Sequence, residues 1–115
     1  ISKDNLMLFM NDHGDALAFD GWTIRSLIGF GFGPSPLTIT NEENFRVFKS
    51  ESSISRHSCR SWSKRELDNG MIRLFQTCEG ADEYKNLILL NEEGSIVLID
   101  QVVTGEGYRI QLNKL

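Results

Sequence analysis

The chain has 115 residues, of which 40% are hydrophobic and 24% charged, and its net charge is −4. This length allows one domain with a real hydrophobic core, and the composition is that of a globular protein rather than a disordered one. The negative net charge argues against general nucleic-acid binding, which needs a cationic surface to displace counterions from phosphates. No apolar run approaches the roughly 18 residues that a membrane-spanning helix needs.

Positive charge is concentrated in one part of the chain. Residues 46–73 carry seven basic and three acidic side chains, so this segment has a net charge of +4 while the remainder carries −8. A basic face on an acidic body is suited to an anionic ligand or to an acidic partner surface. Charges that merely fill the solvent-facing sides of neighbouring strands would give the same pattern, so both interpretations stay open.

The first third of the chain is patterned as β-structure. The apolar run at 6–10 is too short to assign by period, and the polar stretch at 11–15 is typical of a turn. Apolar side chains alternate with polar residues or glycine over 22–32, which predicts a half-buried strand. Its glycines indicate a strong bend, and Pro34 and Pro36 end it because proline cannot donate to a sheet ladder.

The middle of the chain is predicted to form hairpins. The apolar segments at 37–40 and 45–48 flank a polar stretch at 41–44, which is interpreted as a four-residue loop. Further on, Asn69 and Gly70 predict a type I′ turn, because both residues tolerate the positive φ that this turn requires.

The last third continues the same pattern. Residues 79–84 are interpreted as a loop or a single helical turn, while the apolar segments at 87–90 and 96–99 predict another hairpin. Alternation over 108–112 predicts a final strand. With about seven to nine strands at this spacing, the sequence predicts an all-β fold, a small antiparallel β-barrel or half-barrel.

Cys59 and Cys78 are the two cysteines of the chain. If Asn69 and Gly70 are the central turn residues, the cysteines lie diagonally across the hairpin on the same face. A bulge or a longer loop would bring them directly opposite each other, within reach of a disulfide. We expect that disulfide, and with it an oxidising compartment such as the periplasm or the cell exterior. Two buried, unpaired thiols are the alternative.

Catalytic chemistry is poorly supported by the residue types present. His57 and Cys59 stand two apart on one strand face, so a Cys–His nucleophile can be considered, but no flanking sequence specifies the group that would orient the base. Two histidines and two cysteines without a CxxC spacing argue against a zinc site. We therefore predict a non-enzymatic protein with no cofactor and no metal.

A Gly21-Trp22 pair stands immediately before the alternating segment, and antiparallel strands follow as far as Leu112. In this pattern the chain resembles a lipocalin-type barrel in a shortened or half-barrel form. It is similar to the small periplasmic partner subunits of membrane-bound transcription regulators, the ToxS-like group. The resemblance implies a periplasmic domain that pairs with the sensory domain of a regulator, stabilises it and helps it to bind bile salts. No binding residue is assigned by it.

These observations lead to one functional hypothesis. Residues 1–115 are expected to form a single soluble domain, the extracytoplasmic part of a longer chain whose membrane anchor lies elsewhere. It would pair with a partner protein through an exposed strand edge and hold a small amphipathic or anionic ligand. The expected ligand contacts are aromatic or basic: Trp22, Phe30, Phe32, Trp62, Arg56 and Arg60. An inhibitor or immunity protein that blocks a toxin or an enzyme is the alternative.

Overall fold

The computed structural model describes residues 7–33 and 35–113, and within them it contains strands and no helix. Eleven antiparallel strands form one sheet. In chain order they are β1 (Met7–Met10), β2 (Ala16–Phe19), β3 (Ile24–Ile28), β4 (Leu37–Glu42), β5 (Phe45–Lys49), β6 (Ile54–Cys59), β7 (Ser63–Glu66), β8 (Ile72–Glu79), β9 (Glu83–Leu90), β10 (Ile96–Val102) and β11 (Arg109–Asn113). The all-β prediction is confirmed, whereas residue 6 and Pro34, to which predictions were also attached, lie outside the described residues.

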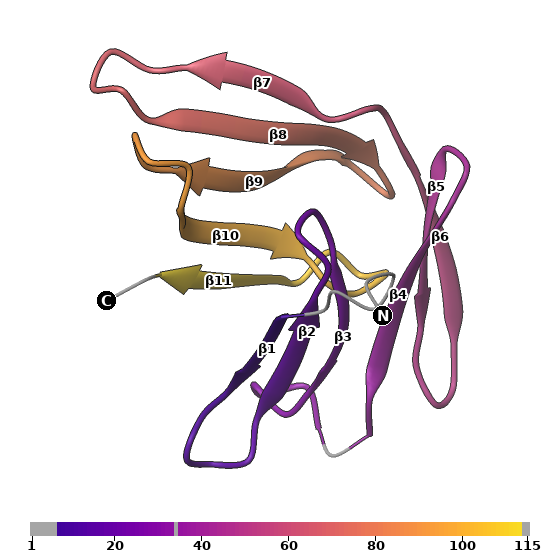
Figure 1. Cartoon of the computed structure of the whole chain (residues 1–115). Helices are drawn as coiled ribbons and strands as arrows, with labels where there is room; N and C mark the ends of the chain where they lie inside the picture. Colours follow the sequence, from indigo (N-terminus) through magenta and orange to yellow (C-terminus); the bar gives the residue numbers. More distant parts are fainter. Residues whose placement is uncertain (1–6, 34, 114–115) are drawn as a thin grey trace.

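The sheet curls strongly into a half-barrel. Its strands follow the chain order from β1 to β6 and then from β8 to β11, while β7 pairs with β8 alongside the end of β6. Figure 1 shows β2 to β6 running across the direction of β8 to β11, so that one half of the sheet faces the other. This arrangement is the orthogonal packing in which two parts of a sheet enclose a single core.

The hydrophobic core lies between these two halves. Both halves contribute buried side chains: Leu17, Phe19, Ile24, Leu27, Ile39 and Phe48 come from β2 to β5, and Ile88, Ile99, Val102, Val103 and Ile110 from β9 to β11 or the residue after β10. Burying one aliphatic or aromatic side chain of this kind contributes about 1.5–3 kcal/mol. The curl is therefore stabilised by apolar contact between segments far apart in the sequence.

The alternating segment at 22–32 contains the predicted strand, but the strand is shorter than predicted. β3 ends at Ile28, and 29–33 form a tight turn in which Phe30 has a φ of 54° and the three glycines have φ between 86° and 98°. Glycine reaches positive φ without steric cost, so these residues allow the chain to reverse. The sequence of this turn resembles a continuation of β3, because Phe30 and Phe32 lie an even number of residues after Ile28, as the next side chains on the same face of a strand would.

Two further turns also differ from their predictions. Glu42 pairs with Phe45, so β4 and β5 are joined by a two-residue turn rather than a four-residue loop. At the β7–β8 turn, Gly70 has a φ of 83° but Asn69 does not adopt positive φ, which excludes the type I′ turn. Of the two alternatives for residues 79–84, the loop is confirmed, because they contain the hairpin turn between β8 and β9.

The predicted disulfide is confirmed. Cys59 of β6 and Cys78 of β8 face each other directly, with 4.0 Å between their Cα atoms, and their sulfur atoms are bonded at 2.08 Å. The ladder between β6 and β8 contains this pair and one other, Ser58 with Glu79. The cross-link therefore joins the two halves of the sheet where their backbone pairing is short.

Gln101 supplies a second connection between the halves, and its side chain is fully buried. The N–H of Ile24 donates to Gln101 Oε1 at 3.0 Å, and Gln101 Nε2 donates to the carbonyl of Trp22 at 2.8 Å. One amide of β10 thus satisfies two backbone groups at or just before the start of β3. Such pairing is required because a buried polar backbone group without a partner is costly.

Loss of the disulfide is expected to destabilise the domain. Replacing both cysteines (Cys59→Ser with Cys78→Ser) removes the cross-link from the unfolded chain, which should lower the free energy of unfolding by about 3 kcal/mol. Urea denaturation of both proteins, with and without reductant, measures this difference. Reductant should destabilise the wild type and leave the double variant unchanged; equal stability of all samples would contradict a structural disulfide.

Gln101→Met is expected to weaken the contact between the two halves. Methionine has a similar volume but leaves the Ile24 N–H and the Trp22 carbonyl without partners, so the free energy of unfolding should fall by about 2–4 kcal/mol. Gln111→Met on exposed β11 is the matched control and should change it by less than about 0.5 kcal/mol. Similar denaturation curves for the two variants would show that the Gln101 amide does not hold the halves together.

Candidate functional site

A cleft of about 360 Å³ opens beside the connection between β2 and β3, and we call it the tryptophan cleft. Both tryptophans of the chain, Trp22 and Trp62, line it, with their ring centroids 5.4 Å apart. Its other wall residues are mostly polar and include Thr23, Asn41 and Gln76. A few polar groups around an aromatic surface are typical of a small-molecule site.

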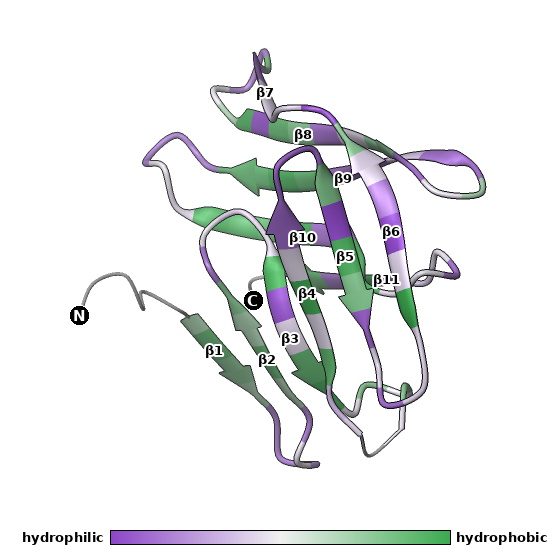
Figure 2. Cartoon of the chain, turned by 90° about the vertical axis from the view of Figure 1, so that its right-hand side faces the viewer, coloured by the Kyte–Doolittle hydropathy of each residue, from purple (hydrophilic) through white to green (hydrophobic). Residues whose placement is uncertain are grey.

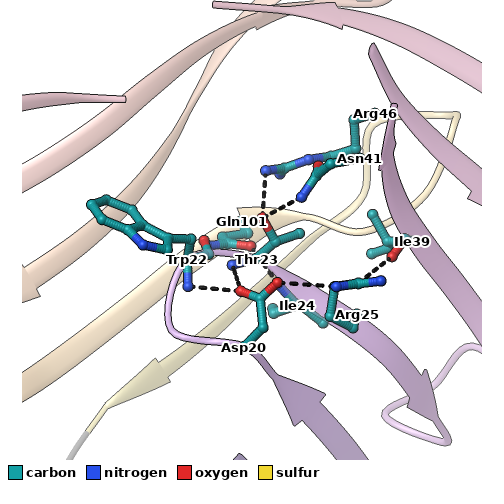
Figure 3. Close-up of polar contacts among 9 residues, drawn as sticks. All are labelled: Asp20, Trp22, Thr23, Ile24, Arg25, Ile39, Asn41, Arg46 and Gln101. Atoms are coloured by element: carbon teal, nitrogen blue, oxygen red, sulfur yellow. Dashed lines mark hydrogen bonds and ion pairs between the residues drawn. The ribbon is translucent and has the colours of Figure 1, made fainter. Parts of the chain in front are cut away.

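Arg46 lies directly behind this cleft with only 1% of its surface exposed. Its Nη2 donates to Thr23 Oγ1 at 3.1 Å and to Gln76 Oε1 at 2.7 Å, so it contacts two residues of the cleft wall. Asn41, its partner across the β4–β5 ladder, donates to the same threonine oxygen at 3.2 Å. Figure 3 shows Arg46 and Asn41 converging on Thr23.

The charge of Arg46 is not compensated by an ion pair within the described part of the chain. Its Nε and Nη1 atoms are buried without any hydrogen-bond partner. Burial lowers the pKa of Arg46 to about 10, so the guanidinium still carries its charge at neutral pH. A buried cation without an ion-pair partner is energetically unfavourable. Ionisable groups in such unfavourable surroundings occur preferentially at functional sites.

Asp20 organises the rim of the cleft, and it attracts Arg46 through space without forming an ion pair with it. Its Oδ1 accepts the backbone N–H groups of Trp22 at 2.9 Å and Thr23 at 2.7 Å, which holds the turn that carries Trp22. Its Oδ2 is paired with Arg25 at 3.2 Å. This carboxylate is therefore already paired with another arginine, while Glu43 is the second acidic residue of the cleft wall.

The structure brings together three of the six residues expected to contact a ligand. Trp22, Trp62 and Arg60 all line the tryptophan cleft. Phe32 instead lines a separate pocket of about 210 Å³ on another part of the surface, and Arg56 is paired with Glu42 on the exposed side of β6.

Phe30, the remaining expected contact, lies in the 29–33 turn and packs against the core. Sequence reasoning missed Arg46, Thr23, Asn41 and Gln76. The burial of Arg46 could have been predicted from its position two residues before the apolar Phe48, because side chains two apart on a strand face the same side. The charge of arginine instead favours a solvent-facing position.

The Cys–His alternative is contradicted for the disulfide-bonded chain. The sulfur of Cys59 is bonded to Cys78, so no thiol is present to act as a nucleophile. His57 is buried, with Nε2 donating to the carbonyl of Gly105 at 3.1 Å and Nδ1 contacting the hydroxyl of Tyr84. Burial raises the pKa of Tyr84 to about 12, so this hydroxyl stays protonated and can donate to Nδ1. Both nitrogens thus have structural partners.

A second candidate site is an apolar groove between β1 and the β10–β11 pair, and we call it the seam. It has a volume of about 580 Å³ and is lined by apolar side chains that include Met7, Phe9, Ile96, Leu98 and Leu112. Figure 2 shows β1 as a hydrophobic strand at the border of the sheet. All four β1 side chains are exposed, and in the described chain β1 has β2 as its one strand partner.

The other free edges are polar. β11 presents the exposed side chains Arg109, Gln111 and Asn113, and all four residues of β7 are polar and exposed. Charged and polar residues on an edge strand discourage pairing with another chain, and β1 has none. The seam is therefore the one border within the described sheet that is open to an added apolar strand.

Comparison with protein-family models, curated proteins and solved structures found no match to this chain. Over the described residues, no helix is long and apolar enough to cross a membrane. Nor do those residues bring together three or more histidine, cysteine or acidic side chains in a way that could hold a metal ion. The site must therefore be interpreted from its own geometry.

Arg46→Met is expected to leave the fold intact and to stabilise it or be neutral. The substitution removes an uncompensated buried charge, while Asn41 still donates to Thr23 and Asn86 to Gln76, so the free energy of unfolding should stay constant or rise by about 1–4 kcal/mol. Arg56→Met, in an exposed ion pair, should change it by less than about 1 kcal/mol. A large loss of stability on replacing Arg46 would instead assign it a structural role.

Proposed function

We propose that this chain is a non-enzymatic, extracytoplasmic binding domain that pairs with a partner protein at the seam and holds a small ligand in the tryptophan cleft. The observation that carries the proposal is the hydrophobic, unprotected edge at β1. Four large apolar side chains at a sheet border, next to an apolar groove, are what β-augmentation uses: main-chain hydrogen bonds to the edge and side-chain contacts in the groove.

The shape of the seam favours one extended segment of a partner as its occupant. Met7 and Phe9 face the groove, whereas Leu8 contributes to a shallower apolar pocket on the opposite face of β1. The far wall of the groove is formed by β10 and β11 of the same curled sheet. A single apolar strand can pair with β1 and contact this wall, whereas a second complete sheet would have to fit between two borders of one sheet.

The disulfide supports the proposed cellular setting. Stable structural disulfides are rare in reducing compartments, which supports the periplasm or the cell exterior. The partner class implied by the sequence resemblance, the sensory domain of a membrane-bound regulator, would be exported in the same way. A toxin or enzyme blocked by an inhibitor protein is the other partner class, and identification of the partner separates the two.

The test is site-specific cross-linking in native cells. A photoreactive benzoyl-phenylalanine replacing Phe9 should give one defined adduct with a second protein, and peptide mapping should place the adduct in an extended apolar segment. The same group in place of Gln111, on polar β11, should not give that adduct. Phe9→Lys should reduce partner capture by about tenfold or more, because a charge cannot be buried in the groove without cost.

The identity of the adduct shows what occupies the seam. An adduct with another copy of this chain would replace the partner with self-association, and an adduct with residues 1–6 of the same chain would mean that the seam is filled internally. Either result, or equal cross-linking from both positions, would overturn the proposal.

A further inference from the structure

The chemistry of the tryptophan cleft specifies what kind of ligand it suits. We propose that the cleft binds an acidic saccharide, with the sugar ring against the tryptophans and its carboxylate on Thr23, directly in front of Arg46. This inference rests on the ligand-binding part of the proposed function and is independent of the seam.

The first argument is the hydrogen-bond pattern at Thr23. Its Oγ1 accepts one hydrogen bond from Arg46 Nη2 and one from Asn41 Nδ2, so both lone pairs of the hydroxyl oxygen are used. The hydroxyl proton remains available as a donor. A hydroxyl that accepts from a cationic guanidinium is polarised and is a stronger donor, which suits an anionic acceptor in the cleft that Thr23 lines.

The second argument is the uncompensated charge. Arg46 is nine-tenths buried or more, its Nε and Nη1 have no partner, and Asp20 is held by Arg25. A carboxylate placed on Thr23 would supply the missing counter-charge across one hydrogen bond. The cleft wall itself carries Arg60 together with the acidic Glu43 and Asp20, and Asp20 is paired with Arg25, so the preference for an anion rests on Arg46 and not on the wall.

The third argument is the balance of polar and apolar groups. A purely apolar acid would leave the wall residues Asn41, Asn44, Ser61 and Gln76 facing hydrocarbon. A pyranose ring has hydroxyl groups at its rim and an apolar C–H face, so it can satisfy such residues and also cover an indole ring. Trp22, which is 47% exposed, offers that indole surface.

The test uses methyl glucuronoside and methyl glucoside, which share the pyranose ring and differ in the carboxylate. Because both tryptophans line the cleft, their two indole N–H signals in NMR spectra of nitrogen-labelled protein report on its occupancy directly. Methyl glucuronoside should shift both signals in a saturable way. Methyl glucoside should bind at least about tenfold more weakly, because it lacks the charge that Arg46 attracts.

Two variants separate the anion site from the cleft as a whole. Thr23→Val removes the hydroxyl donor and Arg46→Met removes the charge, and each should weaken methyl glucuronoside binding by about tenfold or more. Thr40→Val is the matched control: its hydroxyl is buried without a partner, so binding should be unchanged. The dispersion of the NMR spectrum shows in each case whether the variant is folded.

Equal binding of the two glycosides, no saturable shift with either, or full binding by folded Arg46→Met would overturn the acidic-saccharide proposal. None of these results would alter cross-linking at Phe9, so failure at the cleft can be distinguished from failure at the seam.

Discussion

The disulfide between Cys59 and Cys78 holds the sheet at the point where its direction changes. On one side are β1 to β6, and on the other are β8 to β11, with a backbone ladder of two residue pairs between them. The core lies between these halves, so it exists only while the angle between them is kept. The tryptophan cleft depends on the same angle, because Trp22 and Gln76 belong to different halves.

The interior beside this junction contains several buried polar side chains. Arg46, Gln76, Asn86 and Gln101 are all buried; Asn86 links neighbouring strands by hydrogen bonds to Gln76 and Val102, and Gln101 links the two halves. The amides satisfy backbone or side-chain groups and have a structural role. Arg46 differs, because two of its donors have no acceptor. Among the described residues the Thr40 hydroxyl is also buried without a partner, but Arg46 is the charged group in this position, and buried polar groups normally have partners.

The borders of the sheet differ in the polarity of their exposed side chains. Polar side chains protect β7 and β11, and apolar ones leave β1 unprotected. A half-barrel necessarily has borders, because the sheet does not close on itself. A domain that worked alone would be expected to protect every border equally. The asymmetry at β1, combined with the adjoining groove, is the basis for proposing partner binding at the seam.

The amino-acid sequence alone determined that the fold is all-β and that Cys59 and Cys78 are close, because alternation and turn residues act over a few neighbouring positions. It did not determine every strand: the run that contains β1 was too short to assign, and about seven to nine strands were expected where the described chain has eleven. It did not determine the register, since one extra residue at the Gly70 turn changes which side chains face each other. The burial of Arg46 and its position behind Trp22 were decided by the tertiary structure. Those contacts join residues from separate strands, and they arise only when the curled sheet brings its two halves together.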